Sequence, residues 1–137
     1  MRVKIFGAGS IGNHLSNASR ALGWEVDICD ISNDALERTK NLIYPSRYKK
    51  WDDKIGLYLN NEAPKGVYDL IFIGTPPKSH IDIYKLCKKN INYKRILVEK
   101  PITNFNNNSL NNFENKINSE IILSGYNHSI SHSFKYF

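Results

Sequence analysis

The sequence contains few cysteines and no long apolar run, and these two absences exclude several classes of protein. Its two cysteines, Cys29 and Cys87, fit no metal-binding or redox spacing, so we expect both to be reduced and at least partly buried. No apolar segment approaches the roughly 18 residues that a membrane-spanning helix needs. Because a predicted strand begins at residue 2, we expect no signal peptide, no membrane partner and a cytoplasmic location.

The positive charge of the chain is not concentrated in any one segment. The formal net charge is +6, but the lysines are scattered and the pairs Lys49-Lys50 and Lys88-Lys89 are short. Nucleic-acid binding requires a clustered basic face, so we expect no nucleic-acid partner. With 137 residues, 41% of them hydrophobic and 23% charged, the chain has the size and composition of one globular domain with its own core.

Residues 1–30 contain the most informative pattern. Residues 2–6 alternate as a short strand does and lead directly into the run Gly7, Ala8, Gly9, Ser10, Ile11 and Gly12. A helical pattern over 13–23 follows, and then a β-rich run over 24–29. Its alternation, with Val26 and Ile28 on one side and Glu25 and Asp27 on the other, indicates a less buried strand than the first.

The glycine spacing is that of a dinucleotide-binding turn. Gly7 makes the tight turn from strand to helix, Gly9 lets the backbone approach a pyrophosphate, and Gly12 lets the helix pack closely on the strand. The start of the helix then offers unpaired N–H groups and a positive dipole end to phosphates. The alternative is a glycine turn in some other α/β domain, with Asp30 capping the next helix.

Asp30 ends the second predicted strand and favours one cofactor. It follows Gly7 by about twenty residues, the spacing expected for the acid that accepts the adenosine ribose hydroxyls, and Ile31 follows at the same end of the site. A carboxylate there repels a 2′-phosphate, and no arginine follows at once to bind one. Arg38 and Lys40 lie too far along the next helix to replace it, so we predict NAD and not NADP.

The rest of the chain alternates between helical and strand patterns. We predict a helix over 33–42 capped by Ser32 or Asn33, a short strand around 48–51, and a helix through 55–59 capped by Asp52 or Asp53. Further strands are expected over 68–73, 95–98 and 120–124, and further helices over 79–90 and 104–118. This order predicts an α/β fold: a doubly wound parallel sheet (Rossmann) of about six strands, with helices on both faces. Right-handed crossovers then bring the ends of the first and fourth strands together at the switch point, where ligands bind.

Two later turns give the sequence a family resemblance. Gly74-Thr75-Pro76-Pro77-Lys78-Ser79-His80 follows the apolar strand of 68–73, and Glu99-Lys100-Pro101 follows the strand of 95–98. Together with the glycine turn and Asp30, they resemble the nucleotide-binding domain of the glucose–fructose oxidoreductase, inositol dehydrogenase and rhizopine-catabolism (Gfo/Idh/MocA) family. That family's pattern has a T-P-x-x-x-H turn after the fourth strand and E-K-P after the fifth. The resemblance covers essentially the whole chain.

The resemblance implies roles for the residues at the strand ends. Gly7 to Gly12 would hold the pyrophosphate and Asp30 the adenosine ribose, while Glu99 would contact the nicotinamide ribose. Lys100 would point into the catalytic cleft, where its ammonium orients substrate hydroxyls or stabilises charge as a hydride leaves a carbinol carbon. The Lys100–Pro101 bond is a candidate for the cis form. The residues expected to border the nicotinamide half of the cofactor are Thr75, Pro76, Pro77 and His80, with Pro101 beside Lys100. The alternative for His80 is that it only caps its helix.

Length is the main departure from the family. Family enzymes carry a second α/β domain, so we divide the chain into a dinucleotide-binding domain over 1–125 and the start of a truncated or absent substrate domain over 126–137. The resemblance implies an NAD-dependent oxidoreductase acting on a sugar, polyol or sugar nucleotide, homo-oligomeric at full length. The chain alone is expected to bind cofactor and turn over little or no substrate. One alternative is a free-standing, non-catalytic NAD-binding module, and a weaker one is another reductase with a similar first half.

Overall fold

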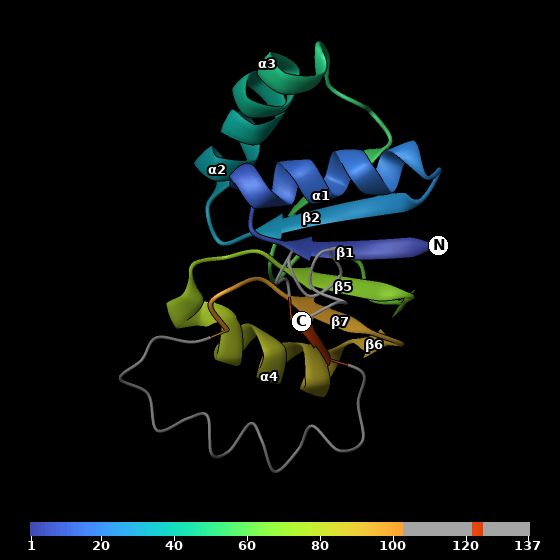
Figure 1. The fold of residues 1–137 in the computed structure, drawn as a ribbon, viewed down its shortest axis with the longest axis vertical. Helices are drawn as coiled ribbons and strands as arrows, with labels where there is room; N and C mark the ends of the chain where they lie inside the picture. Colours follow the sequence, from blue (N-terminus) through green and yellow to red (C-terminus); the bar gives the residue numbers. More distant parts are fainter. Residues whose placement is uncertain (103–121, 125–137) are drawn as a thin grey trace, which may run out of the picture.

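The computed structural model describes residues 1–102 and 122–124, and in this part of the chain the centre is a six-stranded sheet (Figure 1). Every neighbouring pair of strands in it is parallel. The strand order is β3-β2-β1-β5-β7-β8, so the chain moves outward from β1 in one direction and then in the other. The predicted doubly wound α/β sheet is therefore confirmed. The strands are β1 (Arg2–Phe6), β2 (Glu25–Asp30), β3 (Ile55–Leu59), β5 (Leu70–Ile73), β7 (Ile96–Val98) and β8 (Ile122–Ser124).

Helices cover both faces of the sheet (Figure 1). On one face, α1 (Ser10–Ala21) and α2 (Asn33–Arg38) enclose a core to which β1 contributes Val3 and Ile5. On the other face, α4 (His80–Asn90) packs Tyr84 and Cys87 against a second core. Alternate residues of one strand serve the two cores, because successive side chains of a strand point to opposite faces. Both cysteines are free and fully buried, as the sequence predicts.

The first helix begins three residues earlier than predicted, at Ser10 and inside the glycine run. Gly23 ends the turn that follows it with φ +75°, a conformation that glycine adopts without strain. The second predicted helix begins as expected, because the Ser32 hydroxyl accepts a hydrogen bond from the Ala35 N–H at 3.3 Å. It does not stop before Pro45. A π-helical segment (Thr39–Ile43) and α3 (Tyr44–Tyr48) continue it, and Pro45 is tolerated in the first turn of α3.

The predicted strand around 48–51 and the predicted helix through 55–59 are both wrong. Residues 44–48 form α3, and residues 55–59 form the edge strand β3, paired along its length with β2. Asp52 does not cap a helix: its Oδ1 accepts from the Lys54 N–H at 2.9 Å, a local turn that leads into the strand. A five-residue apolar segment is compatible with both the helical and the strand periodicity. Here it forms a strand, because it pairs with the free edge of β2.

The predicted strand over 68–73 is divided. Val67–Tyr68 forms β4, which pairs with β6 (Asn92–Tyr93) in a separate two-stranded sheet, and β5 begins at Leu70. After β5, a 3-10 turn (Pro77–Ser79) precedes α4. Within residues 1–102 and 122–124, no helix has the length and apolar character to cross a membrane.

Three predictions fall wholly or partly outside the described residues. These are the helix over 104–118, the segment over 126–137, and residues 120–121 of the last strand, of which 122–124 form β8. For the described part, the topology fixes where a site lies. The carboxyl ends of β1 and β5 meet at the switch point, because β1 pairs with β5 on one side and with β2 on the other.

Candidate functional site

The glycine run lies at the carboxyl end of β1, and its three glycines meet different surroundings. Gly7 has φ +105°, and a Cβ there would lie 2.9 Å from the Gly74 oxygen after β5. A Cβ on Gly12 would lie 1.9 Å from the Gly7 oxygen. These two glycines are therefore required by the turn itself and by the packing of α1 on it.

Gly9 is different, because nothing in the described part of the chain requires it to be glycine. Its φ of −85° is open to any residue, and a Cβ built on it meets no atom within 4 Å. Gly9 precedes α1, where no side chain caps the helix and no acidic residue lies in the first turn. The first turn of α1 thus offers backbone N–H groups, and the space beside Gly9 is free for a bound group.

Asp30, the last residue of β2, connects to the glycine run directly. Its Oδ2 accepts a hydrogen bond from the Ala8 N–H at 2.8 Å, and its Oδ1 accepts one from the Ser32 N–H at 3.0 Å. Among the described residues, the donors that orient this carboxylate are therefore both backbone N–H groups. Each oxygen keeps a further lone-pair direction with which to accept a hydroxyl.

A cavity of about 520 Å³ lies over the carboxyl ends of the central strands. It collects six of the residues predicted from sequence, which come from the turns after β1, β2 and β5: Gly7, Gly9, Asp30, Ile31, Thr75 and Pro76. The wall also includes Cys29, whose thiol stays protonated because burial raises its pKa to about 12. The cavity is large enough to hold the nucleoside part of a dinucleotide.

Five predicted residues near these turns do not line the cavity. Ala8 and Gly12 are buried members of the glycine run, and the Ala8 N–H donates to the Asp30 carboxylate. Ser10 and Ile11 are exposed on the first turn of α1, and the Ile11 side chain lies against Gly74. Pro77, the fifth, begins the 3-10 turn that follows Pro76.

His80, the first residue of α4, is held by contacts to two turns of the chain. Its ring is almost completely buried. Nε2 lies 2.6 Å from the backbone carbonyl oxygen of Thr75, and Nδ1 lies 3.2 Å from that of Ile102. These two contacts connect the turn after β5 to the segment after β7. His80 thus positions two turns of the site, and it is absent from the lining of the cavity.

The Glu-Lys-Pro turn follows β7 but lies outside the lining of the 520 Å³ cavity. The Glu99 N–H donates to the Ile73 oxygen at 2.9 Å, which holds the turn against the end of β5. Lys100 is exposed, and the Lys100–Pro101 bond is cis, the form suggested by the sequence. Glu99 and Lys100 are therefore beside the switch point but separated from the nucleoside cavity.

The lining residues that sequence reasoning did not assign to the site include Arg38 and Asn60, from the segments after β2 and β3. Arg38 lines the cavity together with Asp30, although its distance along the sequence suggested that it lies too far away. The helical turns of α2 bring it back over the strand end. Asn60 also lines the cavity, and its backbone N–H donates to the backbone carbonyl oxygen of Asp30 at 3.0 Å. The sequence signal for Asn60 is its position directly after a strand. That signal was missed because residues 55–59 were predicted as a helix.

Comparison with known proteins identifies the fold and leaves the family open. No protein-family model matches the sequence, and the comparison with curated proteins gives no match. Among solved structures, apo scyllo-inositol dehydrogenase from Lactobacillus casei superposes with a TM-score of 0.70 at 15% identity. Myo-inositol 2-dehydrogenase from Lactobacillus plantarum gives 0.68 at 20% identity. Each match covers 99% of this chain and 39% of the other, so the chain spans about two fifths of their length.

A third structure is more distant. Acetophenone reductase from Geotrichum candidum, in complex with NAD, gives a TM-score of 0.50 at 19% identity over 90% of this chain and 33% of the reductase. At such identities the similarity concerns the fold alone. The described part of the chain therefore has a Rossmann-like fold, of the kind seen in the dinucleotide-binding domains of dehydrogenases.

Proposed function

We propose that this chain is the NAD-binding domain of an oxidoreductase. The observation that carries the proposal is the free space at Gly9, beside the exposed start of α1 and next to a cavity that holds Asp30. Packing accounts for Gly7 and Gly12, whereas Gly9 is accounted for by a ligand whose phosphates approach the backbone. The inositol dehydrogenases and the reductase bound to NAD support the proposal by their shared fold.

The residues present fit NAD in their order along the cavity. The N–H groups of the glycine run would bind the diphosphate, and the Asp30 carboxylate would accept the adenosine ribose hydroxyls. Exposed Ile31 offers an apolar surface to the adenine. Thr75 and Pro76 would border the path toward the nicotinamide, in the direction of Glu99 and Lys100.

The reaction that we propose is transfer of a hydride between nicotinamide and an alcohol carbon of a sugar, polyol or sugar nucleotide. Bound NAD would supply the ring carbon that accepts or returns the hydride. Lys100 would orient a substrate hydroxyl and stabilise negative charge on its oxygen. The substrate class is supported by the resemblance of the Glu-Lys-Pro turn and by the fold shared with inositol dehydrogenases. The remaining part of the site, and any homo-oligomer, would belong to a longer protein.

Calorimetric titration with NADH and NADPH tests the proposal. We expect NADH to bind, Asp30→Ala to weaken NADH binding by about tenfold or more, and NADPH to bind less tightly than NADH. Arg38→Ala should weaken NADPH in particular, since Arg38 is the cavity cation on the Asp30 side. Lys40→Ala is the matched control, because Lys40 is an exposed cation two residues later that does not line the cavity. Absence of binding by both dinucleotides would overturn the proposal.

A further inference from the structure

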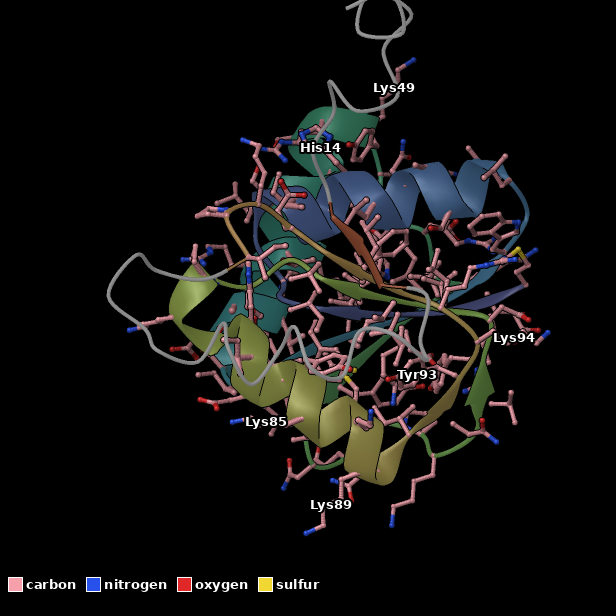
Figure 2. All side chains as sticks on the ribbon, turned by 60° about the horizontal axis from the view of Figure 1, so that its bottom comes forward. His14, Lys49, Lys85, Lys89, Tyr93 and Lys94 are labelled. Carbon is pink, nitrogen blue, oxygen red and sulfur yellow. The ribbon has the colours of Figure 1, made fainter. Side chains whose placement is uncertain are left out.

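The helix α3 is attached to one face of α1 by three polar contacts. Arg47 reaches Ser10, Tyr48 reaches His14 and Tyr44 reaches Asn17, so the partners on α1 are spaced by four and three residues. The Tyr48 hydroxyl lies 2.6 Å from His14 Nδ1, and the Tyr44 hydroxyl donates to Asn17 Oδ1 at 3.3 Å. Figure 2 shows His14 beside this helix. Residues at this spacing share one face of a helix, so α3 is held along α1 over two turns.

Arg47 is the contact nearest the glycine run. Its Nη1 donates to the Ser10 oxygen at 3.1 Å and its Nη2 donates to Ser10 Oγ at 2.9 Å. Ser10 is the first residue of α1, immediately after Gly9. A guanidinium has five N–H donors in a planar fork, so most of its donors remain available beside this turn.

The positive charge of Arg47 lies at the first residue of α1. The start of a helix carries the positive end of the helix dipole, which favours anions and disfavours cations. The first turn of α1 contains no acidic residue, and Gly9 provides no side-chain cap. In the described ranges 1–102 and 122–124, no ion pair involves Arg47. Among the described residues, Arg47 and the first turn of α1 therefore have no anionic partner, and the space beside Gly9 is open to a ligand that could supply one.

We infer that Arg47 is a ligand of the cofactor's diphosphate, held over the start of α1 by α3. The inference rests on the proposed function and adds to it a residue from a segment that is neither in the glycine run nor in the lining of the cavity. A guanidinium fork matches the oxygens of a phosphate, and hydrogen bonds between charged groups are the stronger ones. The two contacts to Ser10 pre-orient the fork before the ligand binds.

The test compares ligands with and without the diphosphate. ADP and adenosine share the adenine and the ribose, so their difference isolates the phosphates; both are titrated by NMR, and NADH by calorimetry. We expect Arg47→Ala to weaken ADP and NADH by about tenfold and to leave adenosine unchanged. Arg47→Lys should retain part of the affinity, because it keeps the charge and loses the fork. Raising the salt concentration should weaken ADP less in Arg47→Ala than in the unmodified chain.

Lys49→Gln is the matched control. Lys49 is exposed, lies two residues after Arg47 and points away from the molecule in Figure 2, so its loss should leave ADP affinity unchanged. Equal weakening of adenosine and ADP by Arg47→Ala would show a structural role and overturn the inference. Unchanged NADH and ADP binding in Arg47→Ala would overturn the inference while the proposed function stands. Failure of the unmodified chain to bind NADH or ADP would overturn both.

Discussion

Two carboxylates on the same strand, Asp27 and Asp30, have opposite surroundings. Asp27 is buried in the middle of β2, where its Oδ2 accepts from Arg2 Nη2 at 3.0 Å and from the Tyr68 hydroxyl at 2.7 Å. Lys4 lies over the Tyr68 ring, with its Nζ 4.4 Å from the ring centroid. Asp30, at the end of the strand, accepts from the backbone N–H groups of Ala8 and Ser32 and lines the cavity.

The difference separates a polar group that serves the fold from one that is available to a ligand. Around Asp27 the polar groups form one cluster within the fold, in which burial lowers the pKa of Lys4, and burial together with Asp27 raises the pKa of Tyr68. A buried charge of this kind needs its partners, because an unpaired charge is costly in the interior. Asp30 is oriented by two neutral backbone N–H groups. Its negative charge is therefore not neutralised by these partners and can interact with a ligand in the cavity.

The largest predicted effect breaks this comparison directly. Asp27→Ala should lower the free energy of unfolding by about 3 kcal/mol, because it removes the carboxylate that pairs with Arg2 and accepts from the buried Tyr68 hydroxyl. Asp30→Ala should lower it by only about 1 kcal/mol, since water in the cavity can replace the carboxylate at the two N–H groups. Urea denaturation of both variants measures the difference. A cost for Asp30→Ala equal to that for Asp27→Ala would mean that Asp30 is structural.

A second, somewhat smaller effect is predicted in the glycine run. Gly12→Ala should destabilise the fold by about 1–3 kcal/mol or more, because its Cβ would overlap the Gly7 oxygen at 1.9 Å. Gly9→Ala should leave the stability unchanged or raise it slightly, since its backbone conformation and its surroundings both accept a Cβ. The same Gly9→Ala variant should bind NADH about tenfold or more weakly, because the methyl group occupies the space assigned to the diphosphate. Thermal unfolding and calorimetry would show the two effects separately, and unaltered NADH affinity would contradict the assignment.

The third prediction concerns the buried thiols, whose effect on stability is smallest at neutral pH and appears at alkaline pH. Burial raises the pKa of Cys29 and of Cys87 to about 12, from a usual value near 9.0. Between these two values the unfolded chain has lost the thiol protons and the folded chain retains them, so stability falls as the pH rises. Each thiol contributes about 1.4 kcal/mol per pH unit in this window. Lys4, with its lowered pKa, acts in the opposite direction.

The measurement is therefore a difference between chains. Urea denaturation at pH 8 and at pH 10 should show a larger loss for the unmodified chain than for Cys29→Ala. Cys29 is informative for the comparison of Asp27 with Asp30, because it lies between them on β2. It lines the cavity and is nevertheless buried. A thiol reagent at pH 8 should label neither cysteine in the folded chain, and rapid labelling of Cys29 would show that the cavity opens more deeply.

Much of the site could be predicted from residues 1–30 because the pattern there is local. The turn at Gly7, the close packing at Gly12 and the strand end at Asp30 follow from the positions of three residues in a continuous segment. Apolar runs and alternation likewise located most of the strands. Prediction failed between residues 44 and 59, where short segments have no decisive period and Pro45 suggested an end to the helix.

The sequence by itself determined the order of strands and helices outside residues 44–59, the glycine turn and the acid that follows the second strand, since each depends on near neighbours in the chain. Only the tertiary structure decided that residues 55–59 pair with the edge of β2, and that Arg38 and Asn60 enter the cavity. It also decided that Asp27 is buried, although the alternation of β2 placed it on the less covered side, and that Arg47 stands over Ser10. These contacts join residues that are far apart in sequence. The energies that settle them come from burial and charge pairing, which no local pattern records.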